Sequence, residues 1–254
     1  MIRGILFDKD GTLIDFFSLW LSAAEAVIPQ ILKENKIQDS DEWVEYLLQS
    51  IGVNQGKVDP KGALACKSYG GIAEVICEAL EKRGEKICIA KVQRQLEEMF
   101  QHNVTRKGIQ FQVLAEMDML MKELKEKDIK IGLATADTLE SAECCLTAIG
   151  VRGYFDFVGA DNGVCKPKPN QEMFLVFAEM FKLGRGEIAV VGDTYNDMVF
   201  AKKSGGVAIG VLSGVSKEAD LVESADYIIT SVKELPRLLE QMEKQEGKVW
   251  QKSC

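Results

Sequence analysis

The sequence predicts an α/β fold, a Rossmann-like parallel sheet covered by helices on both faces, with a small all-helical cap domain inserted after the first strand. Two observations lead to this prediction. From residue 129 onward, short apolar runs bounded by Gly and Asp alternate with amphipathic stretches of helical period, which is typical of right-handed βαβ units. Between residues 16 and 107, helical periodicity predominates and the sequence shows no convincing buried strand.

The strands are predicted where the chain is continuously apolar, because a parallel strand covered on both faces has no polar side. The amphipathic segments between them are predicted to be helices. The predicted strands are Ile2–Phe7, Ile129–Ala134, Phe155–Gly159, Ile188–Val191, Val207–Val211 and Tyr227–Ile229, and the predicted core helices are Val113–Lys127, Thr138–Ile149, Gln171–Leu183 and Asp197–Ser204.

The inserted segment is expected to contain four helices and one long loop. The helices are predicted at Leu19–Lys33, Asp41–Ser50, Ile72–Lys82 and Ala90–Gln101, and the loop at Gly52–Gly71, where Gly and Lys interrupt the pattern. We therefore expect a discontinuous α/β core of residues 1–15 and 108–254 and a cap domain of residues 16–107.

Composition narrows the possible functions. The chain has 254 residues, and Asp and Glu outnumber Lys and Arg by 39 to 31, for a net charge of −8. Without a concentrated basic patch, such a chain is repelled by nucleic acid and by anionic membranes. The single histidine, His102, excludes a multi-histidine metal site. Seven cysteines without a C-x-x-C pair, and no apolar run of membrane-spanning length, predict a cytoplasmic protein.

Chemistry-bearing residues follow the predicted strands, at the edge where sites form in parallel sheets. The first strand is followed by Asp8-Lys9-Asp10-Gly11-Thr12, the second by Thr135, the third by Lys166, and the fourth by Asp193 with Asp197 four residues later. The four aspartates would repel one another without a cation, and all-oxygen ligands favour Mg²⁺. A lysine and a hydroxyl beside them suit phosphate oxygens. Together these groups predict a phosphoryl-transfer site.

The order of these motifs resembles the haloacid dehalogenase-like hydrolase superfamily, in particular the phosphoglycolate phosphatase-like branch with a helical cap. The resemblance covers residues 1–15 and about 108–235. It rests on Phe7-Asp8-Lys9-Asp10-Gly11-Thr12-Leu13, Leu133-Ala134-Thr135, Lys166-Pro167-Lys168-Pro169 and Val191-Gly192-Asp193-Thr194-Tyr195-Asn196-Asp197-Met198. It implies a Mg²⁺-dependent phosphatase that hydrolyses a small phosphorylated metabolite, such as phosphoglycolate or a sugar phosphate, through an aspartyl-phosphate.

The resemblance also implies a role for each site residue. Asp8 would attack phosphorus, and Asp10 would protonate the leaving oxygen and later deprotonate the hydrolytic water. Mg²⁺ is expected on Asp8, on the backbone carbonyl of Asp10 and on Asp193, with Asp197 assisting directly or from outside the first coordination sphere. Thr135 and Lys166 would hold the phosphoryl group. Lys168 competes with Lys166, which is preferred because it opens the K-P-x-P pattern.

Other interpretations stay open at this stage. A sugar phosphomutase of the same branch would return the phosphoryl group to a second hydroxyl, and a silent phosphometabolite-binding module would use the fold without turnover. Lys67 and Tyr69 are candidate substrate contacts, although an idle surface loop would have the same composition. Trp20 is interpreted as a residue of the hydrophobic interior of the cap. We also expect Asp10 to act as an acid when the cap closes and excludes water.

Overall fold

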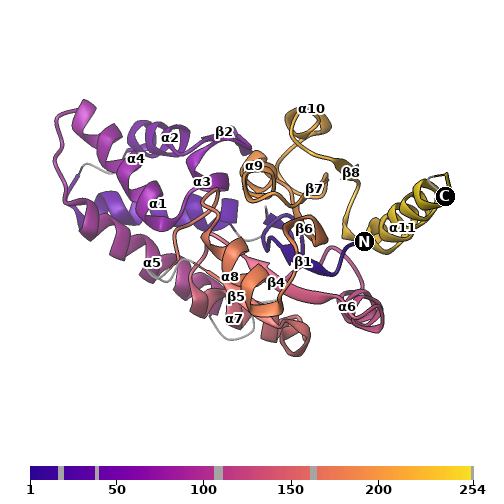
Figure 1. Cartoon of the computed structure of the whole chain (residues 1–254). Coiled ribbons are helices and arrows are strands. Elements are labelled where there is room, and N and C mark those ends of the chain that lie inside the picture. The colour runs from indigo at the N-terminus through magenta and orange to yellow at the C-terminus, as the bar shows by residue number, and fades with distance from the viewer. Residues whose placement is uncertain (17–19, 38–39, 106–110, 161–164, 253–254) are drawn as a thin grey trace.

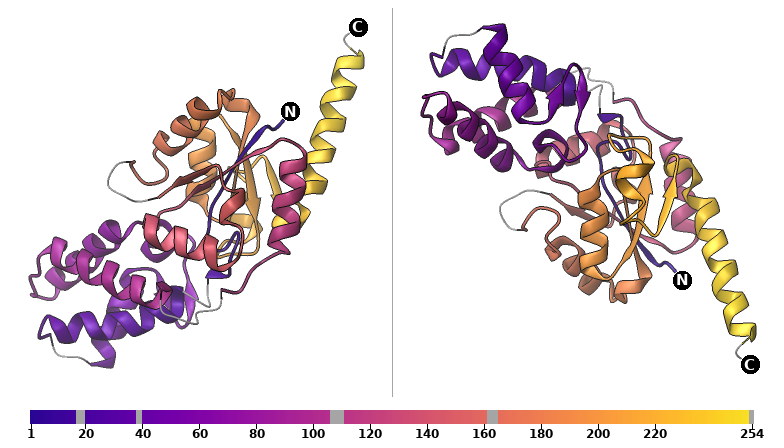
Figure 2. Two further views of the ribbon diagram at one scale, coloured as in Figure 1. Left: turned by 90° about the horizontal axis from the view of Figure 1, so that it is seen from below. Right: turned by 90° about the horizontal axis from the view of Figure 1, so that it is seen from above.

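The computed structural model describes residues 1–16, 20–37, 40–105, 111–160 and 165–252. A group of helices lies beyond one end of an α/β sheet, and the last helix projects away from the opposite side (Figures 1 and 2). The helical group between residues 20 and 105 is called the cap below. The domain boundary predicted at residues 107 and 108 lies outside the described residues.

The sheet positions the site by its strand order. Its six described strands run in the order β5-β4-β1-β6-β7-β8, and every pair is parallel. β1 therefore lies at the centre, with Leu133 and Val191 beside Phe7 at its carboxyl end. The bounds are β1 Gly4–Phe7, β4 Lys130–Ala134, β5 Phe157–Gly159, β6 Ile188–Gly192, β7 Val207–Val211 and β8 Tyr227–Ile229. The predicted fold class is confirmed.

Helices cover both faces because side chains alternate along each strand. Ile5 and Phe7 pack with α6, α7 and α11, whereas Leu6 packs with α8 and α9 on the other face. These helices are α6 Met117–Glu126, α7 Leu139–Ala148, α8 Glu172–Phe181, α9 Tyr195–Ser204, α10 Glu218–Leu221 and α11 Leu235–Lys252. No helix within the described ranges is long and apolar enough to cross a membrane.

The cap is built around its own apolar cluster but is not entirely helical. Its helices are α1 Ser22–Glu34, α2 Asp41–Ser50, α3 Ala63–Cys66, α4 Tyr69–Lys82 and α5 Ile89–Thr105. The segment expected to be a loop contains α3 and a two-stranded antiparallel hairpin, β2 Val53–Asn54 with β3 Lys57–Val58. The hairpin forms because Gln55 and Gly56 both adopt positive φ angles, which a tight turn requires. The expectation of an all-helical cap is therefore wrong in this segment.

Two strand glycines allow α8 to pack directly on the sheet. A Cβ atom at Gly132 would lie 2.7 Å from Leu6 Cδ2 and 2.9 Å from a ring carbon of Phe177. A Cβ atom at Gly4 would lie 2.8 Å from another carbon of that ring. These glycines are part of the core packing, since a larger residue would have to displace the α8 aromatic ring.

We predict that Gly132→Val lowers the free energy of unfolding by about 2 kcal/mol, because it overpacks a filled core. The measurement is urea unfolding followed by circular dichroism. Gly153→Ala is the matched control, since no atom lies within 4 Å of a Cβ built there. Equal stability of the Gly132 variant and the wild type would contradict this account of the packing.

Candidate active site

The carboxyl ends of three neighbouring strands bring the first site residues together. Asp8 follows β1, and its backbone N–H donates to Val191 O at 2.8 Å. Asp193 follows β6, and Thr135 follows β4, where its N–H donates to Gly159 O at 2.9 Å. All three side chains are buried, with 1–9% of each residue exposed. The sheet topology thus gathers residues 58 to 185 positions apart at one edge, as predicted.

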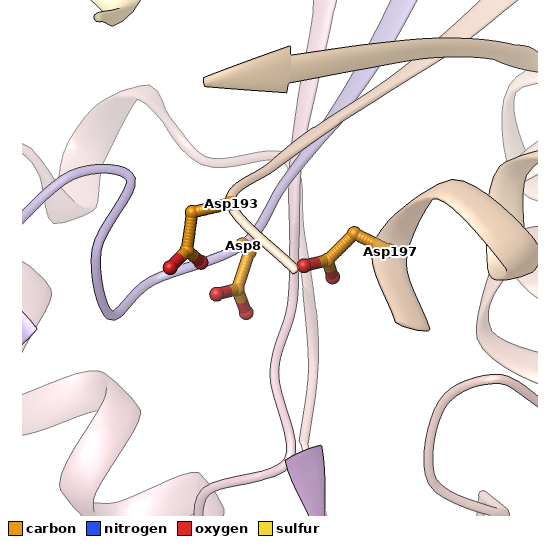
Figure 3. Close-up of side chains that lie close together, drawn as sticks. All are labelled: Asp8, Asp193 and Asp197. Atoms are coloured by element: carbon orange, nitrogen blue, oxygen red, sulfur yellow. The ribbon is translucent and has the colours of Figure 1, made fainter. Parts of the chain in front are cut away.

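Asp8, Asp193 and Asp197 form a buried acidic cluster. Each offers a carboxylate oxygen within 4.8 Å of those of the other two, and the side chains converge in Figure 3. The first turn of α9 holds Asp197, because Thr194 caps the helix and its N–H donates to Asp197 Oδ2 at 3.0 Å. Asp193 Oδ2 accepts the Val215 N–H at 2.8 Å.

Two glycines leave the space that Asp193 needs. Gly11 has a φ of +78°, and a Cβ atom there would lie 2.4 Å from Asp193 Oδ2. At Gly214 a Cβ atom would lie only 1.9 Å from the same oxygen. The backbone therefore approaches the carboxylate more closely than any other residue would permit. This close approach explains why a glycine follows Asp8-Lys9-Asp10.

Lys168, not Lys166, is the lysine of the acidic cluster. Its Nζ lies 2.6 Å from Asp8 Oδ1 and 2.6 Å from Asp197 Oδ1, and 7% of its side chain is exposed. Lys166 lines an outer surface pocket, and its backbone N–H donates to Glu172 Oε2 at 2.9 Å. The preference for Lys166 is corrected here. Both lysines follow the same strand, but only Lys168 contacts the carboxylates of the cluster among the described residues.

Among the described residues, the acidic cluster contains more carboxylates than cations. Burial raises the pKa of Asp8 to about 7, with Asp197 and Asp10 adding to the rise and Lys168 opposing it. Burial also raises the pKa of Asp193 well above its usual value, together with Asp8 and Asp197. Burial disfavours the charge on Lys168, but Asp197 and Asp8 outweigh this and raise its pKa. One lysine thus faces three carboxylates, which favours binding of a further cation.

The acidic cluster fits Mg²⁺. Its donors are carboxylate oxygens, the ligands that this hard cation prefers. Asp193 Oδ1 is buried and has no hydrogen-bond partner among the described residues. An unpartnered buried carboxylate oxygen is costly, and a cation would satisfy it. Asp8, Asp193 and Asp197 are therefore the carboxylates that could hold the ion.

A second buried ion cluster lies on the other side of β1. Lys9 is fully buried, and its Nζ lies 3.0 Å from Asp10 Oδ2 and 2.8 Å from Asp137 Oδ2. Burial raises the pKa of Asp10, while Lys9 lowers it and Asp137 raises it. Asp137 also accepts bonds from the Thr138 N–H at 2.8 Å and the Ser141 hydroxyl at 2.5 Å. No sequence pattern predicted the pair between Lys9 and Asp137, because its two residues lie 128 positions apart.

Two polar contacts join the cap to the core at the site. The Tyr69 hydroxyl, at the start of α4, donates to Asp137 Oδ1 at 3.0 Å. From the core, Asn196 Nδ2 donates to the backbone oxygen of Cys66 at 3.0 Å. The Tyr69 hydroxyl is therefore already bonded to the core. Lys67 is exposed beside the site, and a substrate contact by either residue stays a prediction.

A cavity of about 60 Å³ lies between the cap and the catalytic edge of the core. The core contributes mainly charged and polar groups to its wall, including Asp8, Asp10, Thr135 and Lys168. The cap contributes a mainly apolar wall that includes Trp20. This residue was predicted to lie in the hydrophobic interior of the cap, and it also borders the cavity. The cap residues around the cavity are Trp20, Leu64, Ala65, Cys66, Lys67, Tyr69 and Ile72, and Phe16, which precedes the cap in the chain, also lines it.

Comparison with known proteins gives consistent matches over nearly the whole chain. The family model described as haloacid dehalogenase-like hydrolase matches residues 2–205. The "Probable phosphatase IndB" of Dickeya dadantii (strain 3937) is 29% identical over 227 residues, which cover 89% of this chain and 87% of that protein. A phosphoglycolate phosphatase of Shigella dysenteriae serotype 1 is 28% identical, with 97% of each chain covered.

Solved structures share the fold. A crystal structure of a "predicted phosphoglycolate phosphatase" from Haemophilus somnus 129pt aligns with a TM-score of 0.72 and 17% identity, covering 94% of this chain and 98% of that one. The β-phosphoglucomutase of Clostridium difficile aligns with a TM-score of 0.68 and 19% identity, covering 98% and 100%. At these identities the likeness shows the fold alone.

We predict that Asp137→Ala lowers the free energy of unfolding by about 3 kcal/mol, because it leaves the buried Lys9 ammonium with one carboxylate in place of two. The measurement is urea unfolding at pH 7. Asp118→Ala is the control and should leave the midpoint unchanged, since its pair with Lys122 is exposed. Similar midpoints for the Asp137 variant and the wild type would contradict a buried, charged Lys9.

Proposed function

Because the chain belongs to the haloacid dehalogenase-like hydrolases, we propose that it is a Mg²⁺-dependent phosphatase that hydrolyses a small phosphorylated metabolite through a covalent aspartyl-phosphate. The observation that carries the proposal is the position of Asp8. Its carboxylate lies in the buried acidic cluster, is paired with Lys168 at 2.6 Å, and faces a cavity that Asp10 also lines.

The metal would be held by the side chains of Asp8, Asp193 and Asp197 and by the backbone carbonyl of Asp10. Bound there, Mg²⁺ would neutralise the carboxylates and withdraw charge from the phosphoryl oxygens of the substrate. The −8 chain would otherwise present a negative edge to a phosphate anion. Lys168 adds one fixed positive charge on the same side.

The chain's own residues account for both halves of the reaction. An Asp8 carboxylate oxygen attacks phosphorus, and the ester P–O bond breaks as the leaving oxygen takes the Asp10 proton. A water molecule then attacks phosphorus and gives a proton to Asp10, and the bond from phosphorus to the Asp8 oxygen breaks. Burial favours the neutral, proton-donating form of Asp10, as the first half requires.

Lys168 and Thr135 are the proposed phosphate-binding residues. Lys168 touches the nucleophile and is buried at the cavity, so its charge lies where the phosphoryl oxygens would arrive. Thr135 lines the same cavity, and its hydroxyl oxygen accepts the Asp137 N–H at 3.2 Å, which leaves its own proton to donate to a phosphoryl oxygen. Lys166 has no part in this proposal.

The size of the cavity supports a small substrate. With the cap in the position described, about 60 Å³ is free beside the acidic cluster, so a large leaving group would require the cap to move. Phosphoglycolate and sugar phosphates are the substrate classes we propose. The enzyme would act on them in the cytoplasm, without nucleic acid or membrane partners.

The first test is a screen of the purified protein with Mg²⁺ against a broad panel of phosphate esters. We expect steady phosphate release, loss of turnover when EDTA removes the metal, and restoration on adding excess Mg²⁺. Asp8→Asn should lower kcat by at least about 1000-fold, because an amide cannot form the phosphoenzyme. Isomerisation of a sugar phosphate without phosphate release would favour a mutase, and tight ligand binding without turnover a silent module.

The corrected lysine assignment gives a second test. Lys168→Met should lower kcat/KM for the best ester of the panel by about 100-fold, because it removes the only described cation paired with Asp8. Lys166→Met is the matched control from the same loop and should stay within about 2-fold of the wild type. A larger loss at Lys166 than at Lys168 would overturn the assignment.

A further inference from the structure

Trp20 carries a buried polar group that the fold does not satisfy. Only 6% of the residue is exposed, and its indole Nε1 has no hydrogen-bond partner among the described residues. The ring lines the cavity over the catalytic edge. Buried donors are almost always paired, and an unpaired one costs about 1–3 kcal/mol. An indole N–H without a short hydrogen bond at the edge of a cavity can donate to a ligand atom.

A second unpartnered atom lies at the same cavity. Asp10 Oδ2 is paired with Lys9, but Asp10 Oδ1 is buried without a hydrogen-bond partner. The Trp20 indole acts on the Asp10 carboxyl as a side-chain hydrogen-bond donor and so contributes to lowering its pKa, but Nε1 and Oδ1 do not form a well-aligned, short hydrogen bond. The indole N–H and the Asp10 carboxyl group thus lie close together beside the cavity.

The indole cannot readily turn to find another partner. Lys9 Nζ lies 5.2 Å from the centre of its ring, within cation–π range. Phe100 stacks on the ring with centroids 5.1 Å apart, and Tyr69 packs beside it at 6.1 Å. These contacts come from both the core and the cap, so the direction of the N–H is fixed before substrate arrives.

We propose that Trp20 is a further catalytic residue, whose indole N–H donates a hydrogen bond to the leaving-group oxygen of the phosphate ester. The proposal rests on the phosphatase function proposed above. The ester oxygen lies between Trp20 Nε1 and Asp10 Oδ1. As the P–O bond breaks, its electron pair passes to this oxygen, which takes the Asp10 proton, while the Trp20 proton stays on nitrogen and stabilises the developing negative charge.

The proposal also defines the leaving group. The cap wall beside Trp20 includes Leu64 and Ile72, which offer no hydrogen bond from their side chains. A leaving group that directs its ester oxygen at Trp20 and Asp10 and places carbon atoms against this apolar wall matches the surface. For leaving groups that are already stable as anions, the hydrogen bond from the indole should accelerate P–O cleavage only slightly.

The test compares ethyl phosphate, a phosphate ester, with acetyl phosphate, a mixed anhydride of similar size. Ethoxide is a poor leaving group that needs stabilisation and a proton, whereas acetate leaves readily without either. Two variants remove the N–H, Trp20→Phe and a protein with benzothienylalanine at position 20, which keeps the shape of indole but has sulfur in place of N–H. We expect kcat/KM to fall about 10- to 100-fold for ethyl phosphate and less than about 3-fold for acetyl phosphate.

The control is the same pair of replacements at Trp43, which packs against Tyr46 and Arg83 away from the cavity. These should change neither rate. Equal losses for ethyl phosphate and acetyl phosphate in the benzothienylalanine protein would overturn the role of Trp20, since a purely structural effect does not depend on the leaving group. If the wild type releases phosphate from neither of these compounds nor any ester in the panel, the proposed function itself fails.

Discussion

The architecture of this protein depends on placing three carboxylates, Asp8, Asp193 and Asp197, within 4.8 Å of one another in a buried site. Their mutual repulsion and loss of hydration oppose folding. Several features of the edge offset this cost. Lys168 contacts two of the carboxylates, the Val215 N–H donates to the third, and the N–H of Thr194, the N-cap residue of α9, donates to Asp197. A cation bound at this edge would complete the charge balance and would couple the stability of the edge to metal binding.

Successive side chains after β1 point to opposite faces of the sheet, and this separates two charged clusters. Asp8 meets Lys168 and Asp197, which belong to the side of the sheet covered by α8 and α9. Lys9 turns the other way and meets Asp137 next to α7. Asp10 is paired with Lys9 yet also lines the cavity. One short segment thus keeps the proposed nucleophile and the proposed acid in different electrostatic environments, which is what a division of roles between two carboxyl groups requires.

Sequence patterns predicted the sheet and the aspartates because both follow from local rules. Continuous apolar runs mark buried parallel strands, and the carboxyl ends of such strands meet at one edge. The choice between Lys166 and Lys168 depends on the conformation of a loop, and no periodicity specifies which of two lysines two residues apart turns inward. The contacts that decide it, from Lys168 to Asp8 and from Lys166 to Glu172, reach another element or a side chain several residues away.

The contacts of Trp20 likewise could not be predicted from local sequence patterns. The helical periodicity of the sequence correctly predicts that Trp20 is buried. The periodicity does not show whether the side chain packs inside the cap or against the α/β core. The ring packs on Phe100 of the cap and lies over Lys9 of the core, so it belongs to both. The hairpin β2–β3 escaped detection for a different reason, because two-residue strands are too short to show alternation.

The cap and the α/β core contribute different kinds of side chain to the cavity. Charged groups around the cavity come from the core, apart from the exposed Lys67, whereas the cap supplies mainly apolar side chains and the indole N–H. Tyr69 links the two, since its hydroxyl bonds the same Asp137 that pairs with Lys9. A displaced cap would therefore break a bond within the ion cluster that holds Asp10, and it would also admit water. The position of the cap and the electrostatic environment of Asp10 are thus coupled, because the hydrogen bond from Tyr69 to Asp137 contributes to both.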